Sequence, residues 1–162
     1  MRNKQFVAEH RGGHLTSDDH RGLINWAIAC AEHALLLAPN QSVDNRLIHA
    51  LYIAKEWGKG NVKTGSAMKA AWEAHASARD TANPILKSIA RSIGQAVSTA
   101  HMADHSVGAA LYALKAVRQA GKSIDDERAW QDEKAKKLPQ KIINLIKEAR
   151  NEKQQGFKDL QD

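Results

Sequence analysis

Residues 94–113 of the chain read GQAVSTAHMADHSVGAALYA, and this stretch decides the fold. It has a helical pattern and is crowded with Gly, Ala and Ser. Small side chains let two helix backbones approach closely, so we expect the stretch to lie inside a bundle of helices. His101 and His105 are four residues apart and therefore share a helix face, with Asp104 beside them. The sequence thus predicts a polar cluster within a tightly packed helical centre.

The rest of the composition also favours helices. The chain has 162 residues, three prolines and 5% aromatic residues. No segment alternates apolar and polar residues over the length of a strand. We therefore predict an all-α fold, a single compact bundle of six to seven helices. Residues 17–150 are expected to form this single helical domain, preceded by a flexible N-terminal arm (residues 1–16) and followed by a polar C-terminal tail (residues 151–162).

Capping residues, prolines and glycines mark where the helices start and stop. Thr16 or Ser17 suits the start of the first helix, and Asn83 suits a cap before Pro84. Asp104 is expected to cap the fifth helix after a break at residues 102–103. The expected helices cover roughly residues 17–38, 44–58, 64–80, 84–101, 104–120, 124–138 and 139–150.

The third expected helix carries an informative stripe at spacings of three or four residues. Its members are Met68, Ala71, Trp72, His75 and Arg79. We expect this stripe to face the core. Arg79 would then hold an anion or form an internal ion pair with Glu32 or Asp104, and the ion pair is the preferred interpretation. Such a pair adds little net stability, but losing one partner strands the other.

The candidate site is a polar cluster that several helices would bring together. Its members are Glu32, His75, Arg79, His101, Asp104 and His105. Two histidines four residues apart can ligate a metal, but no third ligand is evident, and Met102 stands where a zinc protease needs glutamate. We prefer hydrogen bonding across helices over metal binding or acid–base catalysis. We therefore assign no metal ligand, no cofactor and no catalytic residue.

The charge balance points to a protein partner more than to nucleic acid. Lys and Arg number 24 against 18 Asp and Glu, which gives a formal net charge of +6. This charge is dispersed, so a solvated surface is the simplest explanation, an acidic partner the next, and nucleic acid is not expected. Trp57 is the tryptophan expected to be partly exposed, beside a Gly-Lys-Gly loop. The lysines expected around it in a partner-binding region are Lys55, Lys59, Lys63 and Lys69.

Cysteine content and hydropathy indicate a cytoplasmic protein. Cys30 is the single cysteine and has apolar neighbours, so we expect a buried, inert thiol. Residues 1–10 are polar and lack the apolar segment of a signal peptide. Residues 27–37 are apolar but short and interrupted by Glu32, so no membrane span is expected.

Four blocks of the chain resemble one known family. They are WAIACAEH (residues 26–33), KEWGKG (55–60), AAWEAHASAR (70–79) and the central stretch at residues 94–113. In this order they resemble the Imm-5-like family of small all-helical bacterial immunity proteins. The central stretch is most similar, to a GxAVxTAHxxxHxxGAAxYA pattern, whereas Asn45-Arg46-Leu47 departs from the family's frequent Asp-Arg-Pro. The resemblance implies a protein that neutralises a cognate bacterial toxin by binding it.

The leading functional hypothesis is therefore non-catalytic binding of a toxin. One alternative is a metal-binding protein or an enzyme that uses the polar cluster. The other is a helical scaffold that forms homo-oligomers through Tyr112 and the C-terminal helices.

Overall fold

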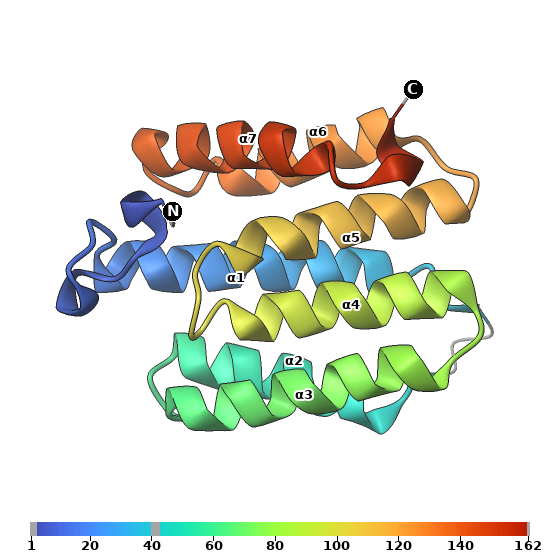
Figure 1. Ribbon diagram of the computed structural model, residues 1–162, viewed down its shortest axis with the longest axis horizontal. Helices are drawn as coiled ribbons and strands as arrows, with labels where there is room; N and C mark the ends of the chain where they lie inside the picture. The colour runs from blue at the N-terminus through green and yellow to red at the C-terminus, as the bar shows by residue number, and fades with distance from the viewer. Residues whose placement is uncertain (1–2, 40–42, 162) are drawn as a thin grey trace.

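The computed structural model describes residues 3–39 and 43–161, and within them the chain forms α-helices and no β-strand (Figure 1). The predicted all-α fold is confirmed. The helices of the described part are α1 (Ser17–Leu35), α2 (Asn45–Gly58), α3 (Thr64–Asp80), α4 (Pro84–Ser98), α5 (His105–Gln119), α6 (Ile124–Ala135) and α7 (Gln140–Gln154). The break expected in the central stretch is present, between α4 and α5.

Side-chain caps explain most of the helix starts. The Thr16 hydroxyl accepts a hydrogen bond from the backbone N–H of Asp19, and the Asn83 side chain accepts two at the start of α4. Asp104 stands at the N-cap position of α5, but its side chain makes no capping hydrogen bond. The predicted position of Asp104 at the start of this helix is thus confirmed, whereas capping by its side chain is not observed. The Asp104 carboxylate lies instead 3.7 Å from the ammonium group of Lys153, which α7 places beside this turn.

α4 is the most central helix of the bundle. It packs against α1, α2, α3 and α5, and the α2–α3 hairpin lies on one side of it. The α6–α7 hairpin lies on the opposite side of the molecule, against α5 (Figure 1). One core cluster fills the space among α1, α2, α3 and α4 and is rich in alanine, and a second joins α1 and α5 to the last two helices. The stretch at residues 94–113 lies between the two clusters, largely buried as predicted.

The predicted inner face of α3 is wrong. Trp72 is 75% exposed, Met68 is 41% exposed, and Arg79 is also exposed. The side chains that α3 buries are small: Ala67, Ala70, Ala71, Ala74, Ser77 and Ala78. An alanine face lets α2 and α4 approach more closely than one bearing Trp and Met would. Close packing therefore turns the large side chains outward.

Both ends of the chain are attached to the bundle, in contrast to the loosely held arm and tail expected. The N-terminal segment forms short 3₁₀ helices and buries Phe6 and Leu15. A backbone hydrogen bond of 2.9 Å from Leu15 to Val7 closes this segment on itself. At the other end, Leu160 is 3% exposed and belongs to the second core cluster. Residues 1–2 and 162 of the two segments lie outside the described residues.

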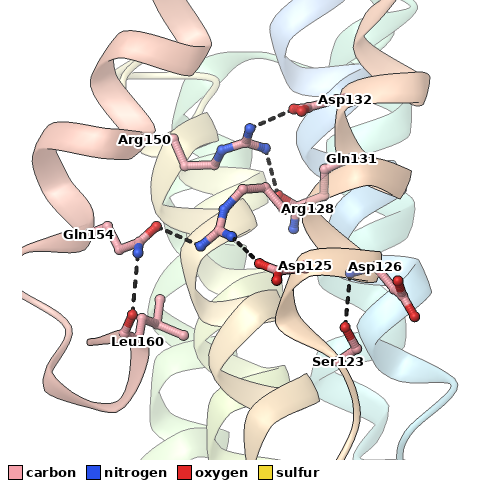
Figure 2. A network of polar contacts seen from close by, with 9 residues as sticks. All are labelled: Ser123, Asp125, Asp126, Arg128, Gln131, Asp132, Arg150, Gln154 and Leu160. Carbon is pink, nitrogen blue, oxygen red and sulfur yellow. Dashed lines mark hydrogen bonds and ion pairs between the residues drawn. The ribbon is translucent and has the colours of Figure 1, made fainter. Parts of the chain in front are cut away.

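A buried polar network joins the α6–α7 hairpin to the rest of the bundle. Gln131 is fully buried, and its side-chain amide donates to the carbonyl of Ala110 on α5 at 3.0 Å. Its backbone carbonyl accepts from the Trp26 indole of α1. Arg150, only 3% exposed, reaches from α7 to the Gln131 side-chain oxygen and to Asp132 on α6 (Figure 2). Nothing in the local sequence pattern indicated this network.

Replacing Arg150 should loosen this junction. In Arg150→Met the side chain keeps its bulk, but the Gln131 oxygen and Asp132 lose a buried donor, so we expect the free energy of unfolding to fall by about 2–3 kcal/mol. The matched control is Lys136→Met, because Lys136 pairs with Glu133 at an exposed site, and a loss below about 1 kcal/mol is expected there. Urea unfolding measures both. Equal losses would contradict the structural role of Arg150.

Candidate functional site

A row of polar side chains crosses three neighbouring helices, and we call it the histidine row. Its members are His75 on α3, Arg91 and Gln95 on α4, His105 on α5, and His101 in the turn before α5. The Arg91 guanidinium donates to Nδ1 of His75 at 2.8 Å. Nδ1 of His105 donates to the side-chain oxygen of Gln95, also at 2.8 Å. The rings of His101 and His105 lie 5.5 Å apart, tilted by 53°.

Two glycines make room for this row. A Cβ added at Gly94 would lie 2.7 Å from the His75 ring, and one at Gly108 would lie 2.5 Å from the Gln95 side-chain oxygen. Each of these side chains therefore rests directly on a helix backbone. The central stretch holds glycine at these positions because the neighbouring helices deliver polar groups there.

The surroundings of His75 keep its imidazole neutral. The pKa of His75 is lowered to about 4, mainly by burial and in addition by the charges of Arg91, His105 and Arg79. The hydrogen bond from Arg91 has the same requirement, since a guanidinium only donates and Nδ1 must accept. His75 is thus an uncharged acceptor at neutral pH.

Half of the predicted polar cluster lies outside the row. Glu32 pairs with Lys55 at 2.8 Å, and Asp104 pairs with Lys153. Arg79 is exposed one turn beyond His75, so the expected internal ion pair of Arg79 with either acid is wrong. The three histidines of the row are half-buried rather than enclosed. The structure therefore brings together His75, His101 and His105, with Arg91 and Gln95 as the partners that the sequence analysis missed.

A cavity of about 530 Å³ lies at one end of the bundle. The N-terminal segment, the turn after α2 and the turn before α5 line it, and His20, Trp57 and His101 are among its side chains. His20 lies 2.6 Å from the carbonyl of Thr99 and 4.8 Å from the Trp57 ring. Burial lowers the pKa of His20. The cavity therefore presents aromatic rings beside His20, whose neutral form is favoured by burial.

The predicted partner-binding region is only partly available. Trp57 is half-buried, and its indole N–H donates to Thr64 at 3.1 Å. Lys55 pairs with Glu32, and Lys59 lies 3.4 Å from a Glu56 oxygen. Lys63 and Lys69 are exposed at the start of α3.

The most exposed tryptophan seen is Trp72, which the sequence analysis placed in the core. A signal for its exposure was present in the sequence. Ala67, Ala71, Ala74 and Ala78 form a helical stripe of their own, at spacings of three and four residues. This alanine stripe and the stripe that begins at Met68 have the same spacing, so the spacing alone does not show which of them faces the core.

The polar side chains of the site are hydrogen-bonding groups. Among residues 3–39 and 43–161, no group of three or more His, Cys, Asp or Glu side chains is placed to hold a metal ion. Cys30 is fully buried, and burial strongly raises the pKa of its thiol, which keeps the sulfur protonated. No helix in the described part is both long and apolar enough to cross a membrane.

Fold and site together define an all-α bundle in which the histidine row crosses three helices and packs against the backbone at two glycines. The sequence pattern of the family described as "Imm-5 like putative immunity protein" matches residues 13–138, which is most of the chain. The chain belongs to this family, so the resemblance stated above is confirmed. The matched range contains the whole histidine row. No significant match was found among curated proteins or among solved structures.

The depressed pKa of His75 predicts a pH-dependent stability. As the pH falls from about 6.5 towards 4, the unfolded chain takes up a proton at this position and folded His75 does not, so the free energy of unfolding should fall. In His75→Gln the loss between pH 7 and pH 5 should be smaller. His49→Gln, at an exposed position of α2, should keep the wild-type loss. Urea unfolding at the two pH values tests this, and identical losses in wild type and His75→Gln would refute it.

The close contact between the His75 ring and Gly94 predicts opposite effects for two glycine replacements. Gly94→Ala gains helix propensity of up to about 1 kcal/mol but pushes the His75 ring off Arg91, so we expect a net loss of about 1 kcal/mol. Gly65→Ala meets nothing within 4 Å and should gain about 1 kcal/mol or less. Thermal unfolding of both variants decides the sign. A stabilised Gly94→Ala protein would mean that the His75 ring does not pack closely against Gly94.

Proposed function

We propose that this chain is a non-catalytic immunity protein that binds a cognate bacterial toxin in the cytoplasm and thereby blocks it. The observation that carries the proposal is its membership of the Imm-5 like family over residues 13–138. A positive net charge of +6 adds a preference for a partner with an acidic surface.

The polar groups of the described residues support binding more than catalysis. His75 is committed to an acceptor role towards Arg91, and its pKa of about 4 leaves it a weak base at neutral pH. The Cys30 thiol is buried and protonated. An inhibitor that works by covering a surface needs neither a tuned base nor a nucleophile.

The proposal predicts a stoichiometric effect on the product of a toxin gene that neighbours the gene for this chain. Production of that toxin in a bacterial host should stop growth, and co-production of this chain should restore it. With the two purified proteins, toxin activity should fall linearly and reach its minimum at an equimolar ratio. A prematurely terminated version of the chain serves as the control for expression load.

Two results would contradict the proposal. One is a stably produced chain that neither restores growth nor co-elutes with the toxin in size-exclusion chromatography. The other is full protection at a small fraction of the toxin concentration, which would indicate a catalyst rather than a stoichiometric inhibitor.

A further inference from the structure

Three helices share one outer surface of the molecule. α3, α4 and α5 run side by side and face the same direction (Figure 1). On α4, the residues that face outward recur every four positions: Lys87, Arg91 and Gln95. The outward residues of α3 include Trp72 and Arg79 on one flank. We call this surface the α3–α5 face and define it by Met68, Trp72, Arg79, Lys87, Arg91 and Lys115.

Two hydrogen bonds between neighbouring helices show that the three helices form one continuous surface here. The His75–Arg91 hydrogen bond ties α3 to α4, and the Gln95–His105 hydrogen bond ties α4 to α5. A shallow hollow of about 240 Å³ continues from Arg91 towards Lys115 on α5. The positive groups of the face are therefore neighbours, held by packed helices rather than by loops.

All charged members of the α3–α5 face are basic. Arg79 and Lys87 are exposed, and Arg91 is bonded to a neutral imidazole, so none of its charge is cancelled by His75. Lys115 has an acidic neighbour, Asp159, at 3.5 Å. The resulting field favours an acidic partner and repels a second copy of the same face.

The same face carries apolar anchors. Trp72 is 75% exposed and Met68, one helical turn before it, is 41% exposed. Trp and Arg are enriched among the few residues that contribute most of the binding energy at protein interfaces. A protein surface that offers an apolar hollow among carboxylates would match both the apolar and the basic side chains of the face.

We infer that the α3–α5 face is the toxin-docking surface, and that it receives an acidic patch of the toxin with an apolar hollow for Trp72. The inference rests on the proposed function and adds the surface and the chemistry of the partner. Trp72 supplies the buried contact, while Arg79, Lys87 and Arg91 set the orientation and speed the encounter. The histidine row keeps Arg91 in place without neutralising it.

The test uses the full chain. The probe is the toxin encoded by the neighbouring gene, and binding is measured by surface plasmon resonance. The variants are Trp72→Ala and the double charge reversal Arg79→Glu/Lys87→Glu. Their matched controls are Tyr52→Ala, at an aromatic side chain of α2 that is 57% exposed, and Lys147→Glu, at an exposed lysine of α7. All the substituted side chains are exposed, so circular dichroism and thermal unfolding should match the wild type.

We expect each face variant to weaken toxin binding by about tenfold or more, and each control by less than about twofold. The association rate of the wild type should fall as NaCl is raised, and that of the double charge reversal should change much less.

Three outcomes would overturn the inference. If the wild type and all variants bind the toxin equally well, the α3–α5 face is not the docking surface, and the proposed function is unaffected. Absence of binding and protection by the wild type would remove both. A fluorescent single-stranded RNA bound by the wild type and by Trp72→Ala, lost in the charge reversal, with toxin binding unchanged in that variant, would assign the face to nucleic acid.

Discussion

The close approach of α4 to its neighbours is the constraint on which the remaining structure depends. α4 touches four other helices, and it can do so because its inward positions hold small side chains between the larger ones. The buried Ser92 hydroxyl donates to the Ala109 carbonyl of α5 at 2.7 Å, which is possible only when the two backbones are near each other. Gly94 and Gly108 extend this closeness to the edge of the interface, where His75 and Gln95 lie over bare backbone. Packing thus places the polar row and fixes its position.

The same constraint decides what reaches the surface. A helix that packs through alanines must carry its bulky residues elsewhere, and α3 carries Trp72 and Met68 on its outer side. The alanine face allows closer backbone contact, and the added dispersion contacts favour this arrangement although it leaves Trp72 exposed. The exposed Trp72 and the tight interface therefore have the same cause, which is that α3 turns its alanine side towards the core. A surface that an immunity protein could use thus arises from the way in which its core is packed.

Sequence reasoning succeeded where the physics is local. The caps Thr16 and Asn83 depend on a few adjacent residues and were predicted at the observed positions, and the break before α5 was predicted although α4 ends earlier than expected, at Ser98. It failed where two periodic patterns competed, as on α3, because periodicity gives a spacing and not a direction. It also failed for the Arg150 network and for the Arg91 partner of His75, since those contacts join helices whose register only the folded bundle sets. The proposed function rests on the family, because no pattern of spacings indicates it.

The environment of His75 suits hydrogen bonding better than proton transfer. A group that works as a proton carrier needs a pKa near the ambient pH, whereas the environment of His75 drives its pKa to about 4. What this environment gains is a guanidinium held by a hydrogen bond to a neutral acceptor, with its full positive charge retained. Side chains already fixed in position lose less conformational entropy when a partner arrives. The arrangement around His75 therefore makes a poor base and a well-positioned cation, which is what a protein that acts by binding requires.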